Sequence, residues 1–390
     1  MAMRRVLKLV LLLATAGYAL SSYASPAYSA TPAFDGINQN LTTPQNTAIN
    51  HFKPRPRAKT KLDYGVWTQL LEGFVVNTGP STRIRSKSYG RGIGTRFRNG
   101  INEPYRLEGN KVLYPYIHPE IKGNIADYAD ELETLGNQLD IPALERNQQL
   151  AFWVNLHNVI VVREISKHYP GPKRRPKDIM PVEGSTAGLH TAKLLHIDGI
   201  ALSLEDIRQR IVYPNWKNPD AAFAFYLGDV SSPSLADVAY EPKALTGQLT
   251  SNAERYVNSL RGTEKGKVSR IYQDIAPWYF PNFEADLATY LKTRMREDVF
   301  AEYKSRGYNG IKKYQSFVND ITSGRGKGRR SASPVFIAGD GGSTFVLGRD
   351  LAQFNSDMIV KVQELNRKEW FKTGTVIIED IEADAEIEVK

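Results

Sequence analysis

Apolar residues recur at helical spacing along several stretches of the chain. In residues 148–169 they surround nearly the whole circumference of a helix, with Phe152, Trp153 and Val161 among them. A helix that is apolar all round is a buried one. In four other stretches the apolar residues keep to one face, which is typical of amphipathic helices on a core. These stretches are residues 62–74, 125–139, 246–260 and 284–296.

Shorter segments have the pattern of strands joined by tight turns. Residues 193–202 turn at an Asp-Gly pair and residues 105–115 at a Gly-Asn pair, so each segment predicts a hairpin. After the first hairpin, Ser203 with Asp206 three positions later predicts a capped helix start. We therefore expect an α+β fold, in which a largely helical domain carries a short-stranded sheet.

The chain divides into five segments by composition. Residues 1–29 combine a basic start, an apolar run too short to span a bilayer and small residues, the pattern of a secretory signal peptide. We expect a flexible basic leader over 30–61, the main α+β domain over 62–322 and a basic glycine-rich linker over 323–333. Residues 334–390 predict a small β-rich module with an acidic tail.

The strands expected in that C-terminal module are four short apolar runs. They are residues 335–337, 345–347, 358–362 and 375–378.

Composition limits the chemistry of the chain. It contains no cysteine, which excludes thiolate nucleophiles, disulfides and cysteine-ligated metals. The formal net charge is +9, which favours anionic partners. With the signal peptide, these features predict an exported soluble protein, and a bacterial periplasm fits. No transmembrane span is expected in the mature chain.

The segment at residues 149–158 reads QLAFWVNLHN. It resembles the signature helix of the domain-of-unknown-function 547 family, which usually reads AFWINLYN. The resemblance covers roughly residues 62–292 and implies a papain- or transglutaminase-like arrangement, whose chemistry needs a thiolate and a histidine. Further pieces follow in the family's order: residues 62–64, 198–207, 223–225, 231–233 and 277–283.

The chain departs from that family pattern at the positions that matter for catalysis. The resemblance implies a histidine where this chain has Ala222 and cysteines where it has Leu227 and Ser232. It also implies an acid at Arg208 and a tyrosine at His157. Leucine can be neither nucleophile nor base, so we expect a non-catalytic protein with a degenerate cysteine-hydrolase-like site.

Three polar residues belong to the same region. Asn155 and Asn158 lie three positions apart on the buried helix, so they face roughly the same way. Buried amides need hydrogen-bond partners, so they either tie a loop backbone to the helix or line a polar pocket. Asp229 suits a turn or a helix cap and is a further pocket-lining or structural candidate.

A serine enzyme is the alternative function, either a hydrolase or an acyl-transferase. Ser231 and Ser232 are the candidate nucleophiles, because they follow the position of the missing thiol. His157 and His196 are the candidate bases, although a hydrogen-bonded core histidine is the simpler interpretation of His157.

A metal site is not expected. His190, His196 and Asp198 could supply three zinc ligands, but no HExxH motif or second histidine pair supports them. We expect a surface hairpin here, with no metal and no cofactor.

Basic residues interleave with aromatic ones between positions 83 and 98. Such a pattern binds polyanions or forms a solvated loop. Export argues against nucleic acid and leaves an envelope polyanion or an acidic protein surface as partner. The candidates are Arg83, Arg85, Lys87, Arg91, Arg96 and Arg98.

The leading hypothesis is an exported, non-catalytic protein that binds an envelope component. Besides the serine enzyme, a third hypothesis is a scaffold protein that assembles through the C-terminal module.

Overall fold

The computed structural model describes residues 49–87, 103–169, 175–322, 335–338, 344–347 and 349–367. Its helices are α3 (Gly65–Phe74), α4 (Pro119–Gln138), α5 (Arg146–His168), α6 (Tyr213–Asn215), α7 (Leu245–Val257), α8 (Arg270–Tyr279), α9 (Phe283–Arg294), α10 (Glu297–Arg306) and α11 (Arg349–Arg367). Its strands are β1 (Val75–Val76), β2 (Lys111–Val112), β3 (Lys193–Ile197), β4 (Ile200–Ser203), β5 (Thr263–Glu264), β6 (Lys267–Val268), β7 (Val335–Ala338) and β8 (Thr344–Leu347). The described strands pair two by two, each pair antiparallel and consecutive in sequence. The predicted α+β class is therefore confirmed.

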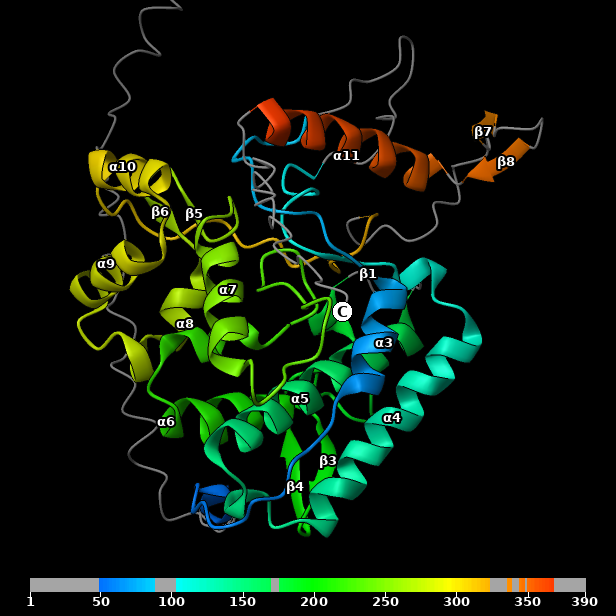
Figure 1. Cartoon of the computed structure of the whole chain (residues 1–390), viewed down its shortest axis with the longest axis vertical. Coiled ribbons are helices and arrows are strands. Elements are labelled where there is room, and N and C mark those ends of the chain that lie inside the picture. Colours follow the sequence, from blue (N-terminus) through cyan, green and yellow to red (C-terminus); the bar gives the residue numbers. More distant parts are fainter. Residues whose placement is uncertain are drawn as a thin grey trace, which may run out of the picture. The chain divides into compact units, whose positions relative to one another are not determined.

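Helix α5 forms the buried centre of the main domain. Phe152, Trp153 and Val161 are all 0% exposed, as the apolar circumference predicted. Helix α4 packs against α5. In Figure 1, α3 and α4 lie to the right of α5, and α7, α8 and α9 lie to its left. The position of α5 means that any polar side chain on it has to find partners inside the protein.

The hairpin β3–β4 forms as predicted. Asp198 and Gly199 both have positive φ, 50° and 72°, which a tight two-residue turn requires. The predicted capping box is also present. Ser203 N–H donates to Asp206 Oδ2 at 2.8 Å, and Asp206 N–H donates to Ser203 Oγ at 3.1 Å. The π-helical segment Asp206–Val212 follows, and it positions Arg208.

The prediction of a hairpin over residues 105–115 is wrong. Residues 105–107 form a turn, and β2 pairs instead with β1, with Val75 opposite Val112. The glycine of the expected turn has φ +68°, but the residue after it is held elsewhere, because Asn110 Nδ2 donates to Leu235 O at 2.9 Å. Strand β2 thus pairs with a strand more than thirty residues away in sequence instead of with the segment just before it.

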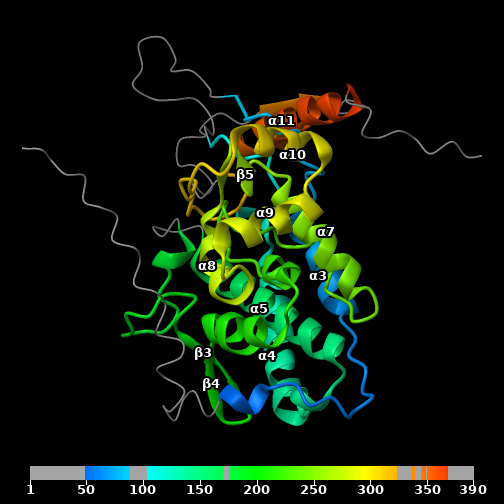
Figure 2. The same cartoon turned by 90° about the vertical axis from the view of Figure 1, so that its left-hand side faces the viewer.

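The C-terminal segment differs from the expected β-rich module. Strands β7 and β8 are present, but residues 358–362 lie within helix α11 rather than in a strand. The reason is a helical stripe through this helix: Phe354, Lys361 and Leu365 are buried, and Asp357 pairs with the buried Arg106. The run at 375–378 and the linker at 323–333 lie outside the described residues. In both Figure 1 and Figure 2, α11 lies at the opposite end of the domain from β3 and β4.

The end of the expected leader packs against the domain. Ile49 and Phe52 are buried, and Arg55 N–H and Arg57 N–H donate to the carbonyls of Pro142 and Ala143 at 2.8 and 2.7 Å. These hydrogen bonds give the strap, residues 49–58, a fixed path that polar composition did not reveal. The predicted signal peptide lies outside the described residues. Over the described chain, no helix combines the length and apolarity needed to cross a membrane.

Candidate functional site

The two asparagines of α5 bind loop backbones. Asn155 Nδ2 donates to Tyr240 O at 2.9 Å, and its Oδ1 accepts from Tyr240 N–H at 3.0 Å. Asn158 Nδ2 donates to Ala224 O at 3.0 Å, and its Oδ1 accepts from Tyr226 N–H at 3.0 Å. Each amide therefore satisfies one buried donor and one buried acceptor of a loop. Asn158 fixes the stretch that leads directly to Leu227.

A buried arginine lies between two histidines beside this stretch. Arg208 Nη1 is 2.6 Å from His157 Nε2 and 3.3 Å from His190 Nδ1. The two imidazole rings are nearly parallel, with an interplanar angle of 15°. We call His157, Arg208 and His190 the His–Arg–His cluster.

The hydrogen bonds of the cluster assign both histidine tautomers. A guanidinium can only donate, so the two ring nitrogens facing Arg208 must accept through their lone pairs. The opposite nitrogens then carry the protons. His157 Nδ1–H donates to Asn158 Oδ1 at 3.1 Å, and His190 Nε2–H donates to Leu227 O at 3.0 Å. Both rings are neutral, and neither has a lone pair left.

The electrostatics of the cluster agree with these tautomers. Burial, and then the charge of Arg208, holds the pKa of His157 well below its ordinary value. The same two causes lower the pKa of His190 to about 3. Burial also lowers the pKa of Arg208, but arginine stays charged in proteins. The cluster is thus one cation held by two neutral acceptors.

The two candidate serines are engaged in loop structure. Ser231 Oγ accepts from Gln315 N–H at 2.6 Å, and Ser232 Oγ donates to Asp229 O at 2.8 Å. In the described chain neither serine hydrogen-bonds a histidine. No hydrogen bond in the described chain therefore joins Ser231 or Ser232 to His157, which lies in the His–Arg–His cluster.

Asp229 supports the same loop. Its Oδ1 accepts from Ser232 N–H at 2.9 Å and its Oδ2 accepts from the Tyr314 hydroxyl at 2.9 Å. Burial raises the pKa of Asp229 to about 7, against the opposing effect of these hydrogen bonds. This carboxyl is a structural acceptor within the loop.

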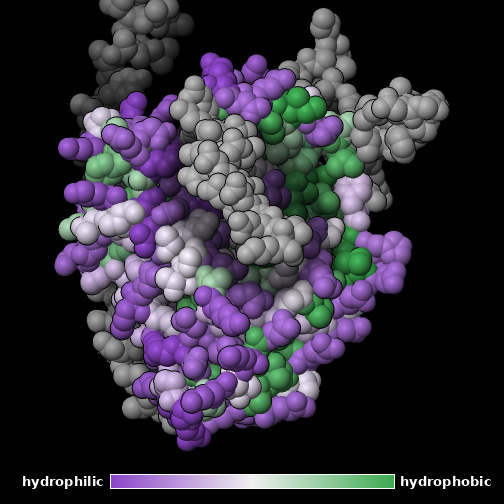
Figure 3. Space-filling view, in the orientation of Figure 1, coloured by the Kyte–Doolittle hydropathy of each residue, from purple (hydrophilic) through white to green (hydrophobic). Residues whose placement is uncertain are grey.

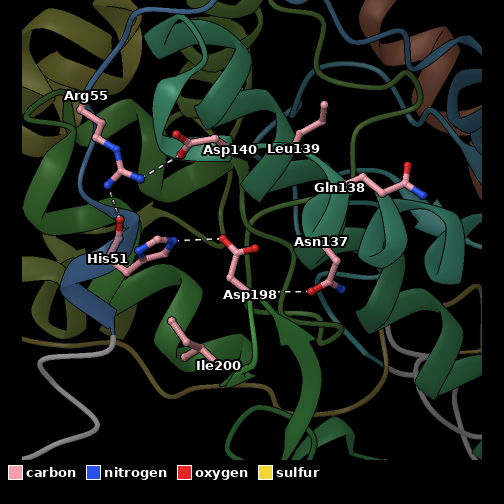
Figure 4. Close-up of a pocket in the computed structure, with 8 residues that line it drawn as sticks. All are labelled: His51, Arg55, Asn137, Gln138, Leu139, Asp140, Asp198 and Ile200. Carbon is pink, nitrogen blue, oxygen red and sulfur yellow. Dashed lines mark hydrogen bonds and ion pairs between the residues drawn. The ribbon is translucent and has the colours of Figure 1, made fainter.

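His196 and Asp198 lie at the tip of the β3–β4 hairpin. The His196 side chain is exposed, and Asp198 Oδ2 is 3.0 Å from His51 Nε2 of the strap. His51 and Asp198 line a cavity of about 540 Å³, and Figure 4 shows them with Arg55, Asn137 and the other lining residues. Within the described ranges, no cluster of three or more metal-binding side chains is found.

Two of the basic candidates are neutralised by ion pairs. Arg83 Nη2 is 2.7 Å from Glu302, and Arg85 Nε is 2.5 Å from Glu264. Lys87 is exposed. Arg91, Arg96 and Arg98 lie outside the described residues.

The fold and site together define an α+β protein whose buried central helix carries an arginine-bound histidine. A model of the family described as "Protein of unknown function, DUF547" matches residues 141–257. This segment, which contains α5 and the His–Arg–His cluster, belongs to that family. Searches of curated proteins and of solved structures returned no match.

Sequence reasoning considered His157, but it missed that Arg208 and His190 surround it. A signal was present, because His157 and Arg208 are both positions at which the chain departs from the family pattern. The structure shows that these two departures contact each other. The remaining departures are Ala222, Leu227 and Ser232. Ala222 is buried in the 3₁₀ helix Pro219–Ala224, and Leu227 accepts the His190 hydrogen bond through its carbonyl.

Proposed function

We propose that this chain is an exported, non-catalytic member of its family that binds an envelope component. The observation that carries the non-catalytic part is the occupied lone pairs of His157 and His190. A general base must offer a free lone pair to the proton of a nucleophile. Arg208 takes both lone pairs and, as a permanent cation, opposes protonation of either ring.

The residues at the family's expected catalytic positions support the same conclusion. Leu227 stands where the resemblance implies a thiol, and Ala222 where it implies a histidine. A papain- or transglutaminase-like origin of the fold is part of this proposal, and the buried helix α5 beside the altered positions is its support. In this interpretation the site keeps the buried helix α5 and has lost the thiol and the histidine that catalysis would need.

Export and envelope binding rest on the sequence. The pattern of residues 1–29 supports export. The net positive charge, +9 for the full chain with three of its basic residues in that segment, supports attraction to anionic envelope polymers. The face of the molecule seen in Figure 3 is largely hydrophilic. Mass spectrometry of the protein from a periplasmic fraction should find an N-terminus shortened by roughly the signal peptide. An intact N-terminus would overturn the export part.

The non-catalytic part is tested with a broad serine-reactive fluorophosphonate probe on the purified, folded protein. We expect no labelling, with a known serine hydrolase as positive control and heat-denatured protein as background. Labelling that Ser231→Ala or Ser232→Ala removes would establish an activated serine. That result would overturn the proposal in favour of a serine hydrolase or acyl-transferase.

A further inference from the structure

Arg208 has an unused set of hydrogen-bond donors. It is 8% exposed, and its two hydrogen bonds in the described chain are both made by Nη1. Nε and Nη2 make no hydrogen bond in the described chain, and neither is among its fully enclosed polar atoms that lack a partner. Together these two nitrogens form the side-on edge of the guanidinium, with parallel N–H bonds.

The same edge binds a carboxylate at two other places in this chain. Arg106 Nε and Nη2 lie 2.7 and 3.1 Å from the two carboxylate oxygens of Asp357. Arg294 Nε and Nη2 lie 3.1 and 2.8 Å from those of Asp220. Parallel bonds from this edge match the spacing of carboxylate oxygens, which is why arginine favours such pairs.

No carboxylate of the described chain occupies that edge at Arg208. Glu205 and Asp274 are near enough for their charges to act on it, but neither hydrogen-bonds it. Asp274 is itself paired with Arg270 at 3.3 Å. A largely buried cation without a hydrogen-bonded counter-charge is costly, so the fold keeps Arg208 at the expense of stability.

The His–Arg–His cluster holds this edge in place. His157 and His190 accept both hydrogens of Nη1, which fixes the guanidinium plane and turns Nε and Nη2 away from the two rings. Because both rings are neutral, they add no positive charge of their own. An anion at the open edge would therefore meet a single, oriented cation.

We propose that Arg208 is the anchor of a carboxylate-binding site, in which Nε–H and Nη2–H donate to the two oxygens of a ligand carboxylate. The ligand is a free organic acid or the carboxylate of a larger molecule. This inference deepens the proposed binding function by naming the chemical group that the site recognises. It is independent of whether a serine is activated.

The test is thermal unfolding of the purified protein, followed by circular dichroism, against increasing ligand at constant ionic strength. The probes are sodium acetate, the blocked dipeptide acid acetyl-alanyl-alanine and the amide of that dipeptide, with sodium chloride as reference. A ligand that binds only the folded state raises the Tm in a saturable way. We expect this rise with at least one of the two acids and none with the amide.

The acids distinguish the two ligand sources. A rise with acetate indicates a site open to free acids, and a rise with the dipeptide acid alone indicates the carboxylate of a larger molecule. An equal rise with the amide, or no rise with either acid in a folded sample, would overturn the inference. Fluorophosphonate labelling would overturn the non-catalytic proposal without changing these results, so the two failures can be told apart.

Variants locate the binding at Arg208. Arg208→Lys keeps the charge and a donor towards the histidines but lacks the side-on edge, so we expect binding of the acid to weaken by about tenfold or more. Arg208→Gln should abolish it. Arg210→Gln, which removes a charge from the same π-helical segment, is the matched control and should bind as the unaltered protein does. Equal binding by Arg208→Lys and the control, both folded by circular dichroism, would refute the assignment.

Discussion

Two asparagines in this protein make the same hydrogen bonds in opposite environments. Asn155 on α5 binds the N–H and C=O of Tyr240 at 3.0 and 2.9 Å and is 0% exposed. Asn137 near the end of α4 binds Asp198 N–H and His196 C=O at 2.8 and 2.9 Å and is exposed. Substituting each with alanine removes the bonds to one backbone N–H and one backbone C=O. Asn137 also loses the bond from its Nδ2 to Glu133 O at 3.0 Å, which is exposed to water, so the difference between the variants measures the effect of burial.

The expected magnitudes follow from what replaces the lost bonds. In Asn155→Ala, the N–H and C=O of Tyr240 are left without the amide, at about 1–3 kcal/mol for each buried group. The free energy of unfolding should therefore fall by about 2–6 kcal/mol. In Asn137→Ala, water takes over all three exposed bonds, and the loss should stay below about 1 kcal/mol. The helix propensity gained by alanine is similar in the two variants, so it cancels in the comparison.

Urea unfolding followed by circular dichroism gives both free energies on one scale. A pair of losses within about 1 kcal/mol of each other would contradict this expectation. Equal losses would mean that water reaches the Tyr240 backbone once the amide is gone. The loop that Asn155 holds would then be less enclosed than its burial indicates.

Three further predictions follow from the buried groups. Burial and Arg208 lower the pKa of His157 and His190, so near and below pH 6.5 the unfolded chain binds more protons than the folded protein. The free energy of unfolding should therefore fall by about 1 kcal/mol per histidine from pH 7.5 to 5.5. A flat urea-unfolding profile over that range would contradict this prediction. Gly228→Ala should lower stability by about 2 kcal/mol or more, because Gly228 has φ +88° and a Cβ there would overlap an isoleucine of α5; an unchanged Tm would count against this packing. Asp357→Ala leaves the buried Arg106 without that carboxylate, so cleavage within α11 in limited proteolysis should accelerate by at least about tenfold; unchanged cleavage would show that the ion pair does not hold the helix.

The sequence alone determined the main helices and the first hairpin. Helix α5 is apolar around nearly its whole circumference, so it is stable only when it is buried, and it is buried in the structure. The Asp-Gly turn and the Ser203–Asp206 capping box are also local, because each is completed by atoms within a few residues. Local hydrogen bonds and periodicity can therefore be read before any tertiary contact is known.

Local pattern failed where a distant segment competed for the same backbone. Strand β2 pairs with β1 rather than with its sequence neighbour, because a strand takes whichever edge the fold brings beside it. Residues 358–362 have strand-like composition, yet they lie in α11, where spacing of three and four places buried residues on one face. The composition of residues 49–58 predicted a polar leader, but in the structure the backbone of this strap hydrogen-bonds to the carbonyls of residues 142 and 143.

The candidate site divides in the same way. The sequence alone showed that Leu227 stands where the resemblance implies a thiol and that His157 and Arg208 are unusual. Each of these observations needs only the residue type at one position. Only the tertiary structure joined His157 on α5, Arg208 on the π-helical segment and His190 before β3 into one cluster. Fifty-one positions separate His157 from Arg208, and no periodicity encodes a contact over that distance. Which lone pairs Arg208 takes, and which donors it leaves open, is decided by packing.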